Sequence, residues 1–195
     1  GEGSCGIAAG AGKVFSALKK ALPENARLEI TGCIGMCWLE PIVDIYIGNK
    51  LIERLVNVSP KDASLIAQAI KTNDFSVVSD LRISSSERGF YEKQTRIALR
   101  NCGVINPENI DDYIKNGGYE SLKKVVLAMT AQEVLEEIKL SGLRGRGGAG
   151  FPTWFKWNAA KDAVGDERYL ICNADEGDPG AFMDRAVIES DPHSL

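Results

Sequence analysis

Apolar side chains recur at helical spacing near the start of the chain. Within residues 8–22, Val14, Leu18 and Leu22 form an i, i+4, i+8 stripe with lysines beside it. A stripe of this period is typical of an amphipathic helix that buries one face. Pro23 follows directly, and because proline has no N–H to continue the helical hydrogen bonds, the predicted helix ends there.

Strand-like patterns and a second helix come next. Residues 26–32 alternate apolar and polar side chains, which predicts a strand, and residues 41–57 predict two more strands joined by a turn at 48–50. Ser59 and Asp62 have the spacing of a capping box, so a helix is expected to begin there. The core face of this helix is predicted to consist of Ala63, Ile66, Ala67 and Ile70.

A loss of periodicity marks a domain boundary. Residues 72–85 follow neither a helical nor a strand pattern and are rich in serine, so we interpret them as a linker. Residues 1–71 then form a first domain with the order loop, helix, strand, loop, hairpin and helix, which is a small α/β unit. Residues 86–195 form the second domain.

The second domain is predicted to be mainly helical. The expected elements are short helices in NPENIDDYIKNGG and GYESLKKVVLAM, a helix in AQEVLEEIKL, a helix over 153–163, a strand in RYLICNA and a helix from about residue 181. Thr130 and Glu133 form a second capping box, and Gly142 is placed to close the helix that this box opens.

Composition and charge narrow the function classes. A formal charge of -4 over 195 residues argues against a nucleic-acid-binding surface, which is normally basic. No apolar run reaches the roughly 18 to 20 residues that span a bilayer. Five cysteines are too few and too unevenly spaced for a disulfide scaffold, which predicts a reducing, cytoplasmic location. Because the chain begins without methionine and stops just after a helix-like stretch, we expect it to be part of a longer polypeptide.

Gly145, Gly147 and Gly150 have the spacing G-x-G-x-x-G of a dinucleotide-binding loop. They follow a predicted helix, whereas the Rossmann motif requires a preceding strand. A glycine-rich turn before a helix still exposes several backbone amides to an anion. Positive charge nearby comes from Arg144, Arg146 and Lys156. The alternative is a surface loop with chance glycines.

The segment YLICNADEGDPG places an amide and three carboxylates after a predicted strand. These side chains are Asn173, Asp175, Glu176 and Asp178. Ligands of α/β proteins bind at the C-terminal ends of strands, and carboxylates suit ribose or ribityl hydroxyls. In isolation a solvated acidic turn is the simpler explanation. Together with the glycine-rich loop, the segment indicates a nucleotide cofactor with two polar ends.

Cys5, Cys33 and Cys37 are candidate metal ligands on two loops. Zinc sites usually contain C-x2-C pairs and four ligands. Thioredoxin-type redox chemistry requires C-x-x-C at a helix start. The C-x3-C spacing with a third, glycine-flanked cysteine suits iron–sulfur ligation better, although three thiols do not complete a four-thiolate site. Buried structural thiols remain an equal alternative at this stage.

Two longer motifs carry a family resemblance. GLRGRGGAGFPTWFKW and CNADEGDPGAFMDR closely resemble the flavin-binding motifs of the NADH-oxidising FMN subunit of respiratory complex I and its relatives in NAD-linked hydrogenases and formate dehydrogenases. Residues 86–195 correspond to about the first third of that subunit. Residues 1–71 resemble a thioredoxin-like 2Fe-2S ferredoxin domain. The fusion is most similar to the beta subunit of NAD(P)-dependent, electron-bifurcating iron-only hydrogenases.

The resemblance implies roles for single residues. The backbone of the glycine-rich loop would line FMN and the nicotinamide nucleotide, through Gly145, Arg146, Gly147, Gly148 and Ala149. Phe151 would stack on adenine, Lys156 would neutralise phosphate, Asn173, Asp175 and Glu176 would hold the flavin, and Asp178 would face the NAD ribose. Cys5, Cys33 and Cys37 would be three of four 2Fe-2S ligands, with the fourth expected ahead of Gly1. Departures from the family pattern are Trp154, Ala159 and Asp178.

The resemblance also implies an activity and an architecture. The expected fold is α/β, with the thioredoxin-like ferredoxin domain followed by the N-terminal part of a Rossmann-like FMN/NADH-binding domain. The function would be hydride transfer between NAD(H) and FMN, with single electrons passed to iron–sulfur subunits of a hydrogenase-type complex and ferredoxin as a further substrate. A 4Fe-4S cluster is expected beyond Leu195, so the fragment alone would be inactive. Alternatives are a subunit without flavin, or the same module in a formate dehydrogenase or a quinone reductase.

Overall fold

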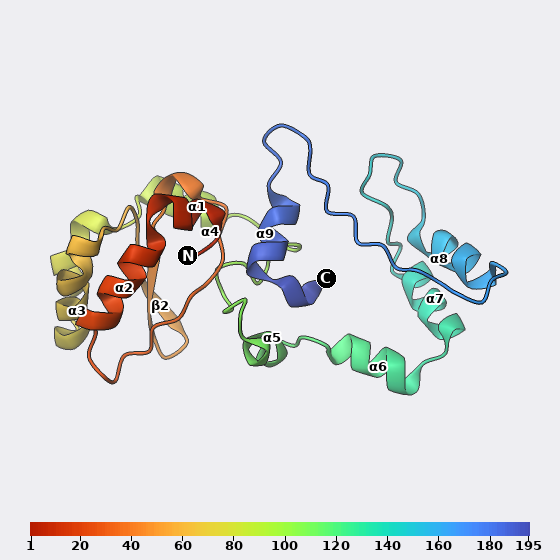
Figure 1. Cartoon of the computed structure of the whole chain (residues 1–195), viewed down its shortest axis with the longest axis horizontal. Helices are drawn as coiled ribbons and strands as arrows, with labels where there is room; N and C mark the ends of the chain where they lie inside the picture. Colours follow the sequence, from red (N-terminus) through yellow and green to blue (C-terminus); the bar gives the residue numbers. More distant parts are fainter. The chain divides into compact units, whose positions relative to one another are not determined.

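The chain divides into two compact units. A computed structural model describes residues 1–195 (Figure 1). Unit 1 comprises residues 1–116 together with 174–195, and unit 2 comprises residues 117–173. The predicted linker at 72–85 stays a prediction, but its residues lie within unit 1.

Two helices replace the single helix expected near the N-terminus. Helix α1 spans Ser4–Ala9 and helix α2 spans Ala11–Ala21. Gly10 separates them because it has φ +99°, a left-handed conformation that residues with a side chain rarely adopt. The apolar stripe of α2 is buried as predicted, with Val14 and Leu18 in the core.

The predicted hairpin is confirmed and contains a β-bulge. Strand β1, Val43–Ile47, pairs antiparallel with β2, Lys50–Leu55. The register shifts between Ile45 and Tyr46, so that Asp44 faces Arg54. An uninterrupted register would place Asp44 opposite Glu53, and like charges directly across a strand pair are destabilising.

Arg54 and Asp44 form a buried ion pair. The guanidinium donates to both carboxylate oxygens of Asp44, at 2.8 and 2.7 Å, and Arg54 is 7% exposed. Burial by itself lowers the pKa of Arg54, but the hydrogen bond and charge of Asp44 outweigh it and the net shift is upward. The ion pair therefore keeps the buried guanidinium of Arg54 charged.

The remaining helices of the first 83 residues include those that complete the first hydrophobic core. Ser59 and Asp62 form the predicted capping box, followed by helix α3, Ala63–Thr72, whose Ala63 and Ile66 are buried. Helices α2 and α3 contact each other, and Figure 1 shows them side by side. The short 3-10 helices are η1, Cys37–Leu39, η2, Pro60–Asp62, and η3, Phe75–Leu81. The first core comprises Val14, Leu18, Ile45, Leu55, Val58, Ala63, Ile66, Ala69 and Val78.

The strand predicted at 26–32 is wrong. These residues form no β-ladder, and the single sheet contains β1 and β2 alone. A cleft of 1180 Å³, lined by residues 25–32 and by 42–49, lies between this segment and β1. Without a strand at this edge the unit does not reproduce a thioredoxin-like sheet, so only a mixed helical and small-sheet architecture, compatible with α/β, is established.

The rest of unit 1 is mainly helical, and its Tyr91 packs against the second core. Its elements are α4, Ser85–Glu92, α5, Ile110–Lys115, α9, Met183–Ser190, and η4, Pro192–Ser194. The backbone of residues 81–83 runs beside β2, because Val56 N donates to Leu81 O at 2.8 Å and Ile83 N donates to Arg54 O at 3.0 Å. This second core consists of Ile34, Met36, Leu39, Ile42, Val56 and Ile83.

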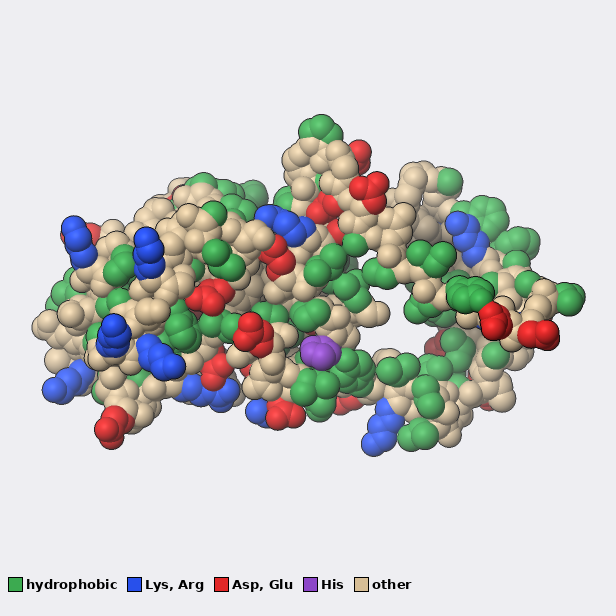
Figure 2. Space-filling model, in the orientation of Figure 1, with side chains coloured by type: hydrophobic (Ala, Val, Ile, Leu, Met, Phe, Trp, Pro, Cys, Tyr) green, Lys and Arg blue, Asp and Glu red, His purple; other side chains and the backbone are tan.

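Unit 2 consists of three helices and an extended tail. They are α6, Glu120–Ala128, α7, Ala131–Leu140, and α8, Thr153–Asp162. The capping box of Thr130 and Glu133 opens α7, and Gly142 follows its end with φ +67°, as predicted. Figure 2 shows many hydrophobic side chains on the surface of this unit. Leu135 is its single buried hydrophobic residue.

The strand predicted in RYLICNA is also wrong. Residues 168–174 are not paired with another strand, and Leu170 is 99% exposed. A strand needs a neighbouring strand to satisfy its backbone groups, and the described residues provide none for this segment.

No helix of the structure has both the length and the apolar character needed to cross a membrane.

Candidate functional site

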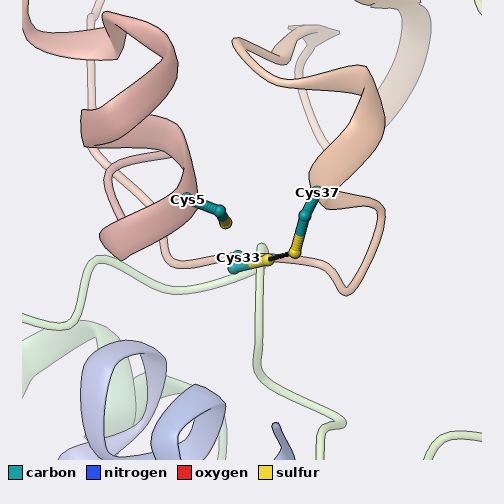
Figure 3. A group of neighbouring side chains, drawn as sticks. All are labelled: Cys5, Cys33 and Cys37. Atoms are coloured by element: carbon teal, nitrogen blue, oxygen red, sulfur yellow. Dashed lines mark hydrogen bonds between the residues drawn. The ribbon is translucent and has the colours of Figure 1, made fainter. Parts of the chain in front are cut away.

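Three cysteine thiols meet at one edge of unit 1. Cys5 lies in the first turn of α1, Cys33 lies in the loop that precedes η1, and Cys37 is the first residue of η1. Figure 3 shows the three side chains pointing toward one another. Their Sγ atoms all lie within 4.8 Å of each other. The structure therefore brings together the three cysteines that the sequence analysis selected.

The spacing of the sulfur atoms suits a metal centre. The Sγ atoms of Cys33 and Cys37 are 3.7 Å apart. A tetrahedral metal with metal–sulfur bonds of about 2.3 Å holds two of its thiolates about 3.8 Å apart. Cys33 and Cys37 can therefore bind the same metal ion without rearrangement, and Cys5 lies close enough to join them as a third ligand. The donor set fits both zinc and an iron–sulfur cluster.

Burial makes two of the three thiols, those of Cys5 and Cys33, harder to deprotonate. Burial raises the pKa of Cys5, and the neighbouring Cys33 raises it further. Burial also raises the pKa of Cys33, although the N–H of Gly35, 3.2 Å from its sulfur, partly offsets this effect. Three thiolates so close together repel one another. A bound cation removes that repulsion, so metal binding and deprotonation are coupled at this site.

The cysteine loop is held by its own apolar residues. Ile34 and Met36 alternate with the glycine between them and are buried in the second core. Gly35 has φ +87°, which turns its N–H toward the sulfur of Cys33. The segment Cys33–Cys37 is thus anchored by packing on one side and presents its sulfur atoms on the other.

Helix α9 packs directly against this loop. A Cβ atom added at Gly32 would lie 1.8 Å from Ser190 Oγ and 2.6 Å from Ser190 Cα. At the other end of the contact, Ser4 N donates to Glu189 at 2.9 Å, and Ser4 Oγ donates to the same carboxylate. Asn101 donates to the buried Asp191 at 2.9 Å. Glycine at position 32 therefore permits α9 to approach the cysteine loop.

We expect Gly32→Ala to destabilise unit 1. The new methyl group would overlap the backbone of α9, and overpacking of this kind costs about 1–3 kcal/mol. The measurement is the free energy of unfolding from urea titration. Gly12→Ala in α2 is the control, because its Cβ would approach no atom closer than 3.9 Å, and alanine is favoured over glycine in a helix by about 0.5–1 kcal/mol. Equal stability of the two variants would contradict the close approach of α9.

The glycine-rich loop of unit 2 exposes its backbone. Of residues 145–149, Gly145 alone uses its N–H in a hydrogen bond, to Phe151 O at 2.8 Å. Gly148 has φ +103°, and a Cβ at Gly147 or Gly148 would meet nothing within 4 Å. Four successive amides, from Arg146 to Ala149, are thus available to a ligand next to the start of α8. The loop fits a phosphate or another polar cofactor group.

The charged and aromatic residues around this loop have defined partners. The guanidinium of Arg144 donates to Gly150 O at 3.0 Å, and that of Arg146 donates to Arg144 O at 2.7 Å. Both arginines therefore brace the loop. Lys156 Nζ lies 5.8 Å from the ring centroid of Phe151, and Phe151 packs edge-on against Phe155 at 5.6 Å. The exposed ring of Phe151 is available for stacking.

The acidic segment begins in unit 2 and continues in unit 1. Asn173 lies in unit 2, and Asp175, Glu176 and Asp178 lie in unit 1. A joint site of this segment with the glycine-rich loop therefore stays a prediction. The carboxylate of Glu176 accepts hydrogen bonds from Asp184 N at 2.8 Å and Arg185 N at 3.1 Å. Although burial alone raises the pKa of Glu176, these hydrogen bonds lower it overall.

Sequence reasoning missed a cluster formed by Arg54, Tyr91 and Arg96, which contacts the cysteine loop through Arg96. Tyr91 has the guanidinium of Arg54 4.4 Å from its ring centroid and that of Arg96 at 5.1 Å. Arg96 also reaches the carbonyl of Ile34. A signal was available for Arg54 alone, since a charged residue inside a predicted hairpin strand needs a cross-strand partner. No local pattern marks Tyr91 or Arg96.

Comparison with known proteins confirms the resemblance seen in the motifs. Residues 138–195 match the sequence family described as the Nuo51 FMN-binding domain. The match contains the glycine-rich loop, helix α8 and the acidic segment. This part of the chain is therefore related to FMN-binding domains of that family.

Similar proteins belong to two kinds of oxidoreductase. The chain is 64% identical over 104 residues to the NADP-reducing hydrogenase subunit HndC of Solidesulfovibrio fructosivorans. The aligned residues make up 53% of this chain and 21% of that protein. It is 48% identical over 99 residues, 51% of the chain and 24% of the relative, to an NADH-quinone oxidoreductase subunit of Rhizobium meliloti. The NADH-quinone oxidoreductase subunit of Aquifex aeolicus is 46% identical over 108 residues, 55% of the chain and 25% of the relative. The chain thus spans a quarter or less of these relatives.

Proposed function

We propose that this chain is part of an NADH-oxidising flavoprotein subunit that binds FMN and passes electrons to iron–sulfur centres. The observation that carries the proposal is the exposed backbone of residues 145–149, within the sequence matched by the Nuo51 FMN-binding domain. When bound, FMN would accept a hydride from NADH and release single electrons. The residues of this chain would bind and orient the two nucleotides.

The glycine-rich loop would hold the flavin and nucleotide phosphates. The amides of Gly147 and Gly148 donate no hydrogen bond within the chain, and Lys156 would add positive charge beside them. Gly145, Arg146 and Ala149 would shape the loop, and Phe151 would stack on adenine. Because Arg144 and Arg146 bond to carbonyls of the loop itself, their main effect would be to keep its amides exposed.

The acidic segment would contact the sugar-like parts of the cofactors. Asn173, Asp175 and Glu176 would hold the flavin, and Asp178 would face the ribose of NAD. Glu176 already accepts two backbone hydrogen bonds from α9, so it would also fix this helix relative to the flavin. No side chain of the segment is required to act as an acid or a base.

The three cysteines would bind a 2Fe-2S cluster. Their sulfur atoms lie within 4.8 Å of one another, and the Cys33–Cys37 spacing of 3.7 Å suits two ligands of one iron. A fourth ligand would come from outside residues 1–195. The cluster would act as a relay between the flavin and a partner subunit, and a 4Fe-4S cluster is expected in the remainder of the polypeptide.

Reduction of the flavin by NADH tests the proposal. Purified full-length protein should show flavin absorbance that bleaches on addition of NADH under anaerobic conditions. NADPH should react more slowly, because its 2′-phosphate would lie near the carboxylates of Glu176 and Asp178. Comparable rates with both nucleotides would remove the preference for NADH. A protein without flavin absorbance would instead be an electron-transfer or assembly subunit, which is the alternative function.

The relatives support two proposals for the wider complex. The similarity to a hydrogenase subunit supports an NAD(P)-dependent, electron-bifurcating hydrogenase with further iron–sulfur subunits in the cytoplasm. The similarity to NADH-quinone oxidoreductase subunits supports the same module in a quinone reductase. Mass spectrometry of co-purifying subunits distinguishes them, because a hydrogenase subunit in the preparation would favour the first assignment.

A further inference from the structure

Arg96 connects three parts of unit 1. It lies in the irregular segment after α4 and is half-buried. Its guanidinium donates to Tyr91 Oη at 2.8 Å, to Cys102 O at 3.2 Å and to Ile34 O at 3.2 Å. Ile34 directly follows Cys33 in the loop that carries two of the three clustered thiols. Arg96 therefore contacts the backbone of the candidate metal site.

The positive charge of Arg96 is not neutralised by a carboxylate. All three acceptors of its hydrogen bonds are uncharged, and Arg96 forms no ion pair within residues 1–195. Arg54, which also lies near the ring of Tyr91, differs because Asp44 pairs with it. Arg96 therefore brings a positive charge without a carboxylate partner into hydrogen-bond contact with the cysteine loop at Ile34.

A carboxylate from another element also lies near the cysteines. Glu189 of α9 accepts from Ser4, the residue before Cys5, and so places negative charge near the thiol cluster. A cluster held here would interact with both charges. Its reduction adds one negative charge, which Arg96 stabilises and Glu189 opposes.

We propose that Arg96 is a positioning residue that holds the Cys33–Cys37 loop and raises the reduction potential of the cluster bound there. The inference rests on the proposed 2Fe-2S site. The step concerned is a one-electron reduction, in which the reductant supplies one electron to the cluster and no bond or proton is transferred. Loss of the positive charge lowers the potential, because the reduced state loses a favourable interaction.

The experiment is a dithionite titration of the purified full-length protein, followed by electron paramagnetic resonance. The signal of this cluster is defined as the part that disappears in Cys33→Ala. Arg96→Gln should lower the ratio of reduced to oxidised cluster about tenfold at a fixed potential, which corresponds to about 59 mV for a one-electron couple. Arg96→Met is a second neutral variant, used if the glutamine variant does not fold.

Two controls separate charge from structure. Arg96→Lys keeps the charge and should retain most of the wild-type potential, even though lysine cannot reproduce the three-way contact. Arg100→Gln removes a charge from an exposed residue of the same segment and should cause no shift. An unchanged potential in both neutral variants, or equal shifts in Arg96→Lys and Arg96→Gln, would overturn the inference. The absence of a Cys33-dependent signal in the wild type would instead overturn the proposed cluster.

Discussion

Replacing Cys33 by alanine should abolish the 2Fe-2S signal of the dithionite-reduced protein. Cys33 is 2% exposed and lies between the other two thiols, with its sulfur 3.7 Å from that of Cys37. Its removal leaves two sulfur ligands from this chain, and no other His, Cys, Asp or Glu of the chain joins the group. A 2Fe-2S cluster needs four protein ligands, so the variant with only two sulfur ligands from this chain should not retain it.

The measurement is electron paramagnetic resonance combined with iron and sulfide analysis. An axial or rhombic 2Fe-2S signal should be present in the wild type and lost in Cys33→Ala, and iron content should fall by two atoms per chain, the number in one such cluster. Cys172→Ala is the matched control, because Cys172 is exposed and lies outside the group. An intact signal in Cys33→Ala would rule out ligation by this residue, and zinc without iron in the wild type would replace the iron–sulfur assignment.

Removing the carboxylate of Asp44 should destabilise unit 1 by about 3–5 kcal/mol, since a buried guanidinium is then left without a counter-charge. The side chains of Arg54 and Asp44 are 8% and 15% exposed, so water replaces the lost partner poorly. The cation–π contact with Tyr91, at 4.4 Å, does not compensate for a carboxylate that accepted two hydrogen bonds. Asp44→Ala should therefore unfold at a much lower urea concentration than the wild type.

A second ion pair provides the control. Glu136 and Lys139 are about half-exposed in α7, and Glu136→Ala should change stability by less than about 1 kcal/mol. The double variant Asp44→Leu, Arg54→Met should recover most of the loss, because it removes both charges together. If Asp44→Ala is no less stable than Glu136→Ala, the buried pair does not support the hairpin register.

Local sequence rules predicted the elements that depend on near neighbours. The capping boxes at Ser59 and Thr130 were found from their spacing, because the side chain and the amide it caps are three residues apart. The hairpin was found from alternation and its turn. The break at Gly10 was missed, although glycine is the residue that permits φ +99°.

Elements that depend on distant partners were predicted less well. The segment 26–32 alternates like a strand, but alternation alone does not supply a neighbouring strand. Residues 168–174 were predicted to form a buried strand, but Tyr169, Leu170 and Ile171 are exposed in this chain. Both failures concern segments whose pairing as strands requires long-range contacts.

The sequence by itself selected the residues that we propose to carry the chemistry: the clustered cysteines, the glycine-rich loop and the acidic segment. Residue type and spacing alone left alternatives open there, and the longer motifs around the loop and the acidic segment narrowed them, because they match a known family. Only the tertiary structure decided that Cys5 meets Cys33 and Cys37, that a bulge aligns Asp44 with Arg54, and that Arg96 faces the cysteine loop. The physical reason is that these contacts join residues far apart in sequence, where packing selects the partners.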